Sequence, residues 1–133
     1  LEKLNMAAVV IGSKKDSICS KIKSGFSNCI DMSGKTSLRD AMAIIAEAKF
    51  IIGSDTGLMH AAEALGRKVL MILGPTSIET GGGTYLPGSI NLGKDIWCRP
   101  CSQNGKSPCY RKKQFCLESI DSVDIINSLD IKS

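Results

Sequence analysis

The sequence has no apolar run of about 18 residues, and its N-terminal segment lacks the layout of a signal peptide. The first absence excludes a membrane-spanning helix, and the second gives no sign of export, so we expect a cytoplasmic protein. An N-terminal methionine is also missing, because the chain begins at Leu1. This start indicates a fragment, and we expect a preceding half of the protein to be missing.

A P-loop is absent too, although Gly34, Lys35 and Thr36 form the sequence that ends such a motif. The motif requires another glycine five positions before Gly34, and Cys29 occupies that position. The segment is instead typical of a helix start, because Ser37 and Asp40 have the spacing of a capping pair.

The chain does contain alternating apolar strands and helices, with the length and composition of one globular domain. Apolar runs predict strands at residues 6–11, 28–31, 50–52, 69–73 and 89–92, and helical spacing predicts helices at 16–26, 37–48, 57–65 and from 122 onward. This order predicts an α/β fold, a Rossmann-like parallel sheet with helices on both faces, plus a cysteine-rich loop. Spacing predicts three buried helix faces: Ile18, Cys19 and Ile22; Leu58, Ala61, Ala62 and Leu65; Val123, Ile126 and either Leu129 or Ile125.

Residues 49–77, KFIIGSDTGLMHAAEALGRKVLMILGPTS, hold the side chains best suited to binding a ligand. A strand there runs into a helix at Thr56, Gly57 and Leu58, so unpaired N–H groups and the positive end of the helix dipole face the turn. With Thr56 as N-cap, His60 lies one turn later on the same face. A hydroxyl, backbone amides and an imidazole would then converge on one anion, which predicts a phosphate site.

Asp55 does not suit a phosphate cradle, because a carboxylate repels a diphosphate. We interpret Asp55 as an acceptor for sugar hydroxyls or as part of the turn itself. Ordinary cap-and-turn chemistry also explains these residues, and a lone histidine in a helix is usually structural. Pro75 and Thr76 leave the next strand at the edge where open α/β sheets bind ligands. Glycines 81–83 fit either a mobile flap beside a phosphate site or a slack connection, and we interpret them as slack.

Four late cysteines are spaced C-x2-C-x7-C-x6-C, which in a cytosolic chain favours thiolate ligation of a metal over disulfides. Zinc is the usual occupant, although such ligands also hold iron. Free thiols or adventitious disulfides are the alternative. The proposed metal ligands are Cys98, Cys101, Cys109 and Cys116.

Positive charge is concentrated in the same segment. Residues 94–113 contain six basic residues against Asp95 alone, which makes this segment +5 and the rest of the chain −1. Trp97, Tyr110 and Phe115 interleave with these charges. Two interpretations of such a patch are open: it binds an anionic partner, or it is simply a loop whose charges are solvated. A four-cysteine metal module that binds nucleic acid is a rival interpretation.

The motif GSDTGLMHAAEALG followed by LGPTS resembles the C-terminal domain of the ADP-heptose:lipopolysaccharide heptosyltransferases, glycosyltransferase family 9. An upstream GKTSL and a late cysteine group agree in order, so the resemblance covers about residues 7–129, and it is most specific over 54–60. Two departures concern loop shape: Arg67-Lys68 stands where the family often has a proline, and Leu73 where it often has an aromatic residue.

The resemblance implies that residues 1–133 are the donor-binding half of a GT-B enzyme, with 94–118 as a cysteine-rich basic insertion and the N-terminal acceptor domain absent. The intact enzyme would transfer heptose from ADP-heptose to the lipopolysaccharide inner core with inversion and without a cofactor, and this fragment alone would be inactive. The catalytic residues would be Asp55 and His60, and the substrate-binding residues would be Thr56, Gly57, Leu58, Lys35, Thr36, Asp16, Pro75 and Thr76, with Lys14 as a weaker candidate.

The resemblance also bears on metal and partners. In related autotransporter heptosyltransferases a cysteine finger carries iron, so zinc and iron both stay open as structural metals. The basic patch fits an anionic inner-membrane surface or a phosphorylated glycolipid core, and no nucleic acid is expected. A stand-alone nucleotide-sugar-binding module without catalysis remains the alternative.

Overall fold

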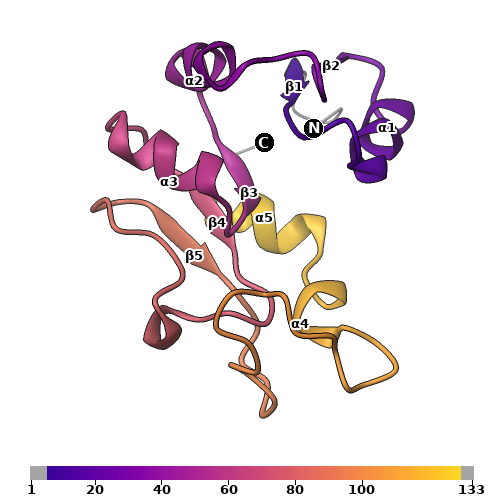
Figure 1. The fold of residues 1–133 in the computed structure, drawn as a ribbon, viewed down its shortest axis with the longest axis vertical. Helices are drawn as coiled ribbons and strands as arrows, with labels where there is room; N and C mark the ends of the chain where they lie inside the picture. The colour runs from indigo at the N-terminus through magenta and orange to yellow at the C-terminus, as the bar shows by residue number, and fades with distance from the viewer. Residues whose placement is uncertain (1–5, 130–133) are drawn as a thin grey trace. The chain divides into compact units, whose positions relative to one another are not determined.

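The computed structural model describes residues 6–129, which form two compact units, residues 6–44 and 45–129 (Figure 1). Both units pair parallel strands and cover them with helices, as the alternating sequence pattern predicts. No helix within residues 6–129 combines the length and apolar character needed to cross a membrane.

The first unit begins with a βαβ arrangement. Strands β1 (Ala8–Val10) and β2 (Cys29–Asp31) pair in parallel, and α1 (Ser17–Ser24) packs against both. Cys19 is buried as predicted, but Ile18 and Ile22 are 59% and 42% exposed. The prediction that all three face inward was wrong, because α1 is only 8 residues long and buries a narrow face on two short strands.

The helix predicted at residues 37–48 is confirmed by α2 (Leu38–Glu47), which runs across the boundary between the units. Its first turn holds the predicted capping pair. The Ser37 hydroxyl donates to Oδ2 of Asp40 over 2.7 Å, and the Asp40 N–H donates to the Ser37 hydroxyl over 3.2 Å.

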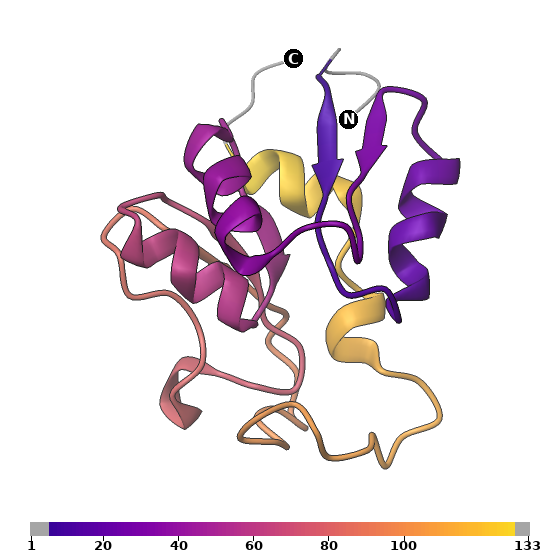
Figure 2. The same cartoon turned by 45° about the horizontal axis from the view of Figure 1, so that its top comes forward.

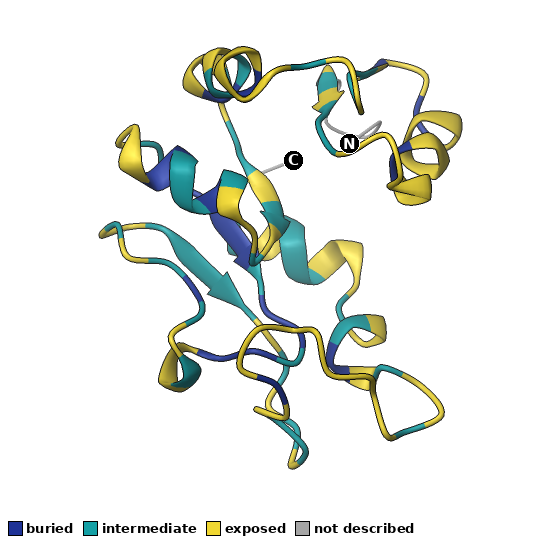
Figure 3. Ribbon diagram, in the orientation of Figure 1, coloured by how far each residue is buried: buried dark blue, intermediate teal, exposed yellow. Residues whose placement is uncertain are grey.

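The second unit contains a three-stranded parallel sheet in the order β3 (Ile52–Ser54), β4 (Leu70–Ile72) and β5 (Ile90–Leu92). Helices α3 (Gly57–Ala64) and α5 (Ser122–Ser128) lie on opposite sides of this sheet (Figure 2). Leu70 and Met71 on the central strand are fully buried, and Figure 3 shows burial concentrated along β4 and α3. The short helices η2 (Ile78–Thr80) and α4 (Phe115–Glu118) complete the unit.

The buried face of α3 differs from the predicted one. Met59, Ala62 and Glu63 are buried, whereas Leu65 is 42% exposed. Met59 packs over Gly53 so closely that a Cβ at Gly53 would lie 2.8 Å from its sulfur. Burial of Glu63 has a polar cause, because its carboxylate accepts hydrogen bonds of 2.8 to 3.1 Å from the Tyr85 and Leu86 amides.

Two element ends also differ from prediction. Strand β3 starts at Ile52 rather than Phe50, because pairing with β4 begins where Ile52 faces Leu70. At α5 the sequence predicts Ser122 as the N-cap, but Asp121 takes that position, and its carboxylate accepts 2.9 Å hydrogen bonds from the Val123 and Asp124 amides. The predicted inward residue Val123 is 58% exposed, because α5 turns it away from the sheet.

Candidate functional site

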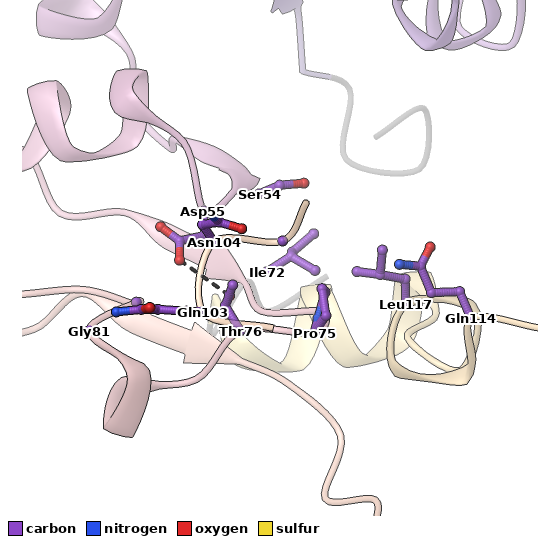
Figure 4. Close-up of a pocket in the computed structure, with 13 residues that line it drawn as sticks. Ser54, Asp55, Ile72, Pro75, Thr76, Gly81, Gln103, Asn104, Gln114 and Leu117 are labelled. Carbon is purple, nitrogen blue, oxygen red and sulfur yellow. Dashed lines mark hydrogen bonds between the residues drawn. The ribbon is translucent and has the colours of Figure 1, made fainter. Parts of the chain in front are cut away.

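A cavity of about 450 Å³ opens in the second unit at the carboxyl ends of β3 and β4 (Figure 4). Its size falls within the range of small-ligand sites in proteins, and its position is where open parallel sheets bind ligands. The cavity is lined by Ser54, Asp55, Ile72, Gly74, Pro75, Thr76, Gly81, Gly82, Gln103, Asn104, Gly105, Gln114 and Leu117.

Asp55, which follows β3, contacts both α3 and the loop after β4 through its carboxylate. Its Oδ2 accepts a 3.3 Å hydrogen bond from the Thr76 hydroxyl (Figure 4). Its Oδ1 lies 3.0 Å from Nε2 of His60. An ionised carboxylate only accepts, so Nε2 carries the proton of this contact. Nδ1 of His60 is buried and has no hydrogen-bond partner in the described part of the chain. Thr76, His60 and Asp55 therefore form one polar network on the cavity side of β3.

The N-terminus of α3 lies next to this network and is open. Thr56 is the N-cap in extended conformation, yet its hydroxyl makes no capping hydrogen bond. Thr56 and Gly57 are exposed, and no atom lies within 4 Å of the position that a Cβ on Gly57 would take. The first amides of α3 and the Thr56 hydroxyl thus face solvent, the usual setting of an anion site at a helix N-terminus, whereas none of Thr56, Gly57, Leu58 and His60 lines the cavity.

Glycines 81–83 are not the slack connection that the sequence indicates. Gly81 ends η2 with φ 83°, and Gly83 has φ 89°. A Cβ at Gly82 would lie only 2.5 Å from Oδ2 of Asp55, so the missing side chain lets the loop approach the carboxylate. Gly81 and Gly82 therefore line the cavity and pack closely against the residues around it.

The late segment provides the other wall, which the sequence did not predict. Gln103, Asn104 and Gly105 line the cavity together with Asp55 and Thr76, and a Cβ on Gly105 would lie 4.0 Å from Cγ2 of Thr76. Leu117 of α4 packs on Gly74, where a Cβ would stand 2.9 Å from its side chain. These residues follow the end of β4 by 31 or more positions and have no periodicity, so only the three-dimensional fold identifies them.

The remaining candidates lie in the first unit. Gly34, with φ 66°, approaches the backbone and Cβ of Lys14, and its N–H donates to the Gly12 carbonyl over 2.9 Å. The turn 12–16 and the loop 33–36 are thus adjacent at the carboxyl ends of β1 and β2. Within them, the Asp16 carboxylate accepts from the Ser13 amide over 2.7 Å, and the Lys35 ammonium donates to the Asp31 carbonyl over 2.8 Å. Thr36 is half-buried beside Lys35.

The structure does not assemble the predicted thiolate site. All four late cysteines are free thiols, and no three His, Cys, Asp or Glu side chains within residues 6–129 are placed to hold a metal. Cys98 receives a 3.5 Å contact from the Arg111 guanidinium, and the Cys109 thiol is directed at the Lys113 carbonyl. Burial raises the pKa of the Cys116 thiol above its ordinary value. The residues as arranged here do not fit zinc or iron.

Comparisons with known proteins identify the family. The model of glycosyltransferase family 9 (heptosyltransferase) matches residues 1–110. Lipooligosaccharide heptosyltransferase 2 of Haemophilus ducreyi is 38% identical over 79 residues, which cover 53% of this chain and 23% of that protein. Lipopolysaccharide heptosyltransferase 2 of Escherichia coli is 43% identical over 49 residues, which cover 37% of this chain and 14% of that protein. The chain therefore matches less than a quarter of the length of these relatives.

Solved structures agree in fold. An Escherichia coli structure described as ADP-heptose lps heptosyltransferase II superimposes with a TM-score of 0.72 at 23% identity, covering 93% of this chain and 35% of that one. A glycosyltransferase of family 9 from Veillonella parvula gives a TM-score of 0.73 at 19% identity, covering 96% and 36%. At this identity the likeness shows the fold alone, and the family assignment rests on the sequence match. The chain belongs to glycosyltransferase family 9, the heptosyltransferase family.

Proposed function

We propose that this chain is the donor-binding half of a heptosyltransferase-like enzyme of lipopolysaccharide core synthesis, and that its donor is a nucleoside-diphosphate sugar such as ADP-heptose. The observation that carries the proposal is the open N-terminus of α3 beside a cavity at the carboxyl ends of β3 and β4. The Gly57 and Leu58 amides and the Thr56 hydroxyl have no hydrogen-bond partner among residues 6–129, so they suit a diphosphate, and the cavity has room for the attached sugar or nucleoside.

Each site residue takes a definite role in this proposal. Thr56, Gly57 and Leu58 hold the diphosphate through the Thr56 hydroxyl and backbone amides. His60, fixed by Asp55 at 3.0 Å, adds positive charge when it is protonated. Asp55 orients the sugar through its hydroxyls, and Pro75 and Thr76 shape the cavity beside it.

The chemistry follows from the leaving group. An acceptor hydroxyl of the lipopolysaccharide core attacks the anomeric carbon, the bond from that carbon to the diphosphate oxygen breaks, and the nucleoside diphosphate leaves with the electron pair. Donors aimed at the diphosphate stabilise its growing charge. The base that takes the proton of the acceptor belongs to a preceding acceptor domain, so these 133 residues alone should not transfer heptose. A non-catalytic sugar-nucleotide-binding module would bind the donor equally well, and transfer by the full-length protein separates the two.

Calorimetric titration with ADP, UDP and GDP tests the donor site. We expect binding of a nucleoside diphosphate that is weakened about tenfold or more by Thr56→Ala and by His60→Ala. Because the Thr56 hydroxyl makes no capping bond, Thr56→Ala should leave the melting temperature nearly unchanged.

Ser89→Ala is the matched control, since Ser89 precedes β5 at the other end of the sheet. Its hydroxyl accepts a 3.1 Å hydrogen bond from the Val69 amide, so its loss should lower stability by about 1 kcal/mol and leave binding intact. No binding of any nucleoside diphosphate, or unchanged binding by Thr56→Ala, would contradict the proposal.

A second candidate function, contact with an anionic membrane surface, is favoured by an exposed aromatic and cationic cluster. Trp97 is 80% exposed and Tyr110 65% exposed, and the Arg111 guanidinium lies 5.4 Å from the Trp97 ring and 4.5 Å from the Phe115 ring. Lys112 and Lys113 are exposed next to them. Amphipathic aromatic rings combined with basic side chains suit the headgroup region of an anionic bilayer.

Sedimentation with lipid vesicles tests this contact. We expect binding to vesicles with anionic lipid, little binding to zwitterionic vesicles, and about fivefold weaker binding after Arg111→Gln. Lys68→Gln removes the same charge outside the cluster and should bind as the unchanged protein does. Equal binding by both variants, or salt-dependent binding of RNA in preference to vesicles, would contradict the membrane contact.

A further inference from the structure

Arg99 lies behind the cavity wall and makes contacts that the proposed donor chemistry does not use. Its Nε donates to the Gly74 carbonyl over 2.6 Å, its Nη2 to the Thr76 carbonyl over 3.0 Å, and its Nη1 to the Lys94 carbonyl over 2.5 Å. Two of these acceptors belong to the loop that lines the cavity after β4. One guanidinium therefore joins the late segment to the cavity loop.

The backbone around Arg99 strengthens the same connection. The Cys101 and Ser102 amides both donate to the Pro75 carbonyl, over 3.1 and 3.3 Å. Every carbonyl of the loop 74–76 therefore accepts from the segment 99–102. Gly93 leaves room for the guanidinium, because a Cβ there would lie 2.8 Å from Nη1 and 2.9 Å from Nη2. These contacts fix the position of the Thr76 backbone, and the Thr76 hydroxyl in turn donates a hydrogen bond to Asp55.

The charge of Arg99 is not neutralised by an ion pair. The ion pairs among residues 6–129 are His60 with Asp55 and Lys94 with Asp124, so no carboxylate contacts the guanidinium. Glu79 only senses the guanidinium charge from a distance: the pKa of Glu79 is lowered chiefly by a hydrogen bond from Ser77 and to a smaller extent by Arg99. The three acceptors of the guanidinium are neutral carbonyls, which solvate a cation without cancelling its charge. A half-buried positive charge thus stands directly behind the wall that faces Asp55, where it offsets the repulsion between that carboxylate and a bound diphosphate.

We propose that Arg99 is a positioning residue of the donor site, one that holds the loop 74–76 and biases the cavity electrostatically toward a diphosphate. The inference rests on the proposed function, because it concerns how the same site favours its ligand. It also gives the late segment a role in donor binding that requires no metal. Since Arg99 acts through carbonyl groups and through its charge, it need not touch the donor.

The test compares a charged with an uncharged ligand, because a purely structural role would affect both alike. ADP and adenosine are titrated by NMR into the unchanged protein, Arg99→Gln, Arg99→Lys and Lys68→Gln. We expect Arg99→Gln to weaken ADP binding about tenfold and adenosine binding less than twofold. Arg99→Lys keeps the charge but not the planar guanidinium, so its affinity for ADP should lie between those of the unchanged protein and Arg99→Gln. Lys68 precedes β4 at the opposite end of the sheet, so Lys68→Gln should change neither affinity.

Gly93→Ala provides a second variant if Arg99→Gln fails to fold, since the added methyl group displaces the guanidinium while keeping every charge. It should weaken ADP binding about threefold and leave adenosine binding unchanged. An equal loss for both ligands, or no loss, would overturn the inference while ADP binding by the unchanged protein still supports the donor site. Absence of ADP binding by the unchanged protein would overturn both.

Discussion

Gly82 is the residue at which the fit of the cavity is tightest. A methyl group at this position would stand 2.5 Å from Oδ2 of Asp55, 3.1 Å from the Ser77 carbonyl and 3.4 Å from Cβ of Thr76. Gly82→Ala should therefore turn the Asp55 carboxylate away from Thr76. We expect a stability loss of only about 1 kcal/mol, because one side chain can rotate, but a loss of donor binding of about tenfold or more, measured by calorimetry.

Gly25→Ala is the matched control for that change. A Cβ at Gly25 meets the Lys21 carbonyl at 3.6 Å, an ordinary contact, and its φ of −90° suits alanine. This variant should bind the donor as the unchanged protein does. Normal binding by Gly82→Ala as well would mean that the position of Asp55 does not matter for the donor.

At the residue level, sequence reasoning selects side chains whose role follows from local pattern and misses those whose role depends on long-range contacts. Asp55, His60 and Thr76 come from a strand-to-helix turn and a strand end, and they lie in one network. Gly82, Gln103 and Arg99 belong to loops whose course depends on contacts more than 20 residues away. No local pattern records such contacts. The four cysteines show the opposite error, since their regular spacing did not place their thiols together.

At the scale of helices and strands, hydrogen bonds to the Glu63 carboxylate hold α3 against the loop before β5. Burial tends to raise the pKa of this carboxyl, but hydrogen bonds from the Leu86 and Tyr85 amides outweigh it and lower the pKa below its usual value near 4.5. A lowered pKa in the folded state means that the unfolded state binds protons first as the pH falls. The stabilising contribution of Glu63 is therefore complete above about pH 4.5 and is lost as the pH falls through the lower, folded-state pKa.

Glu63→Gln should reduce the free energy of unfolding by about 2 kcal/mol at pH 7, because two amides lose a charged acceptor. The difference from the unchanged protein should shrink as the pH falls below about 4.5. Urea unfolding at several pH values measures it. Asp121→Ala, which removes a cap on α5, should lower stability by about 1 kcal/mol at pH 7 and serves as the comparison. A difference for Glu63→Gln that grows toward low pH would contradict this assignment.

Helices and strands could be predicted from the sequence wherever capping and apolar spacing agree. Ser37 and Asp40 start α2 as expected, and Gly66 ends α3 in the left-handed conformation with φ 74°. The buried face of α3 could not be predicted, because spacing counts Leu65 as apolar and Glu63 as polar. In the structure Glu63 is buried and Leu65 is exposed, because the Glu63 carboxylate accepts long-range hydrogen bonds from the Tyr85 and Leu86 amides.

For the whole molecule, alternation of apolar runs with helical segments was enough to predict an α/β fold with parallel strands. The division into units at residue 44 was not predicted, because α2 is continuous across it and no linker composition marks it. The family match ends at residue 110, while the structure shows Gln114 and Leu117 lining the cavity. The wall of the site thus extends past the part of the chain that the family model recognises.

Backbone amide shifts during an ADP titration test the donor site most directly. In a ¹H–¹⁵N spectrum, ADP should shift the amides of Thr56, Gly57 and Leu58 most, followed by those of residues 74–76 and 81–82, with a saturable dependence on concentration. Adenosine should shift the first three much less, because it lacks the diphosphate. If ADP saturates the protein while the amides at the start of α3 stay unmoved, the diphosphate binds elsewhere and the proposed donor site is wrong.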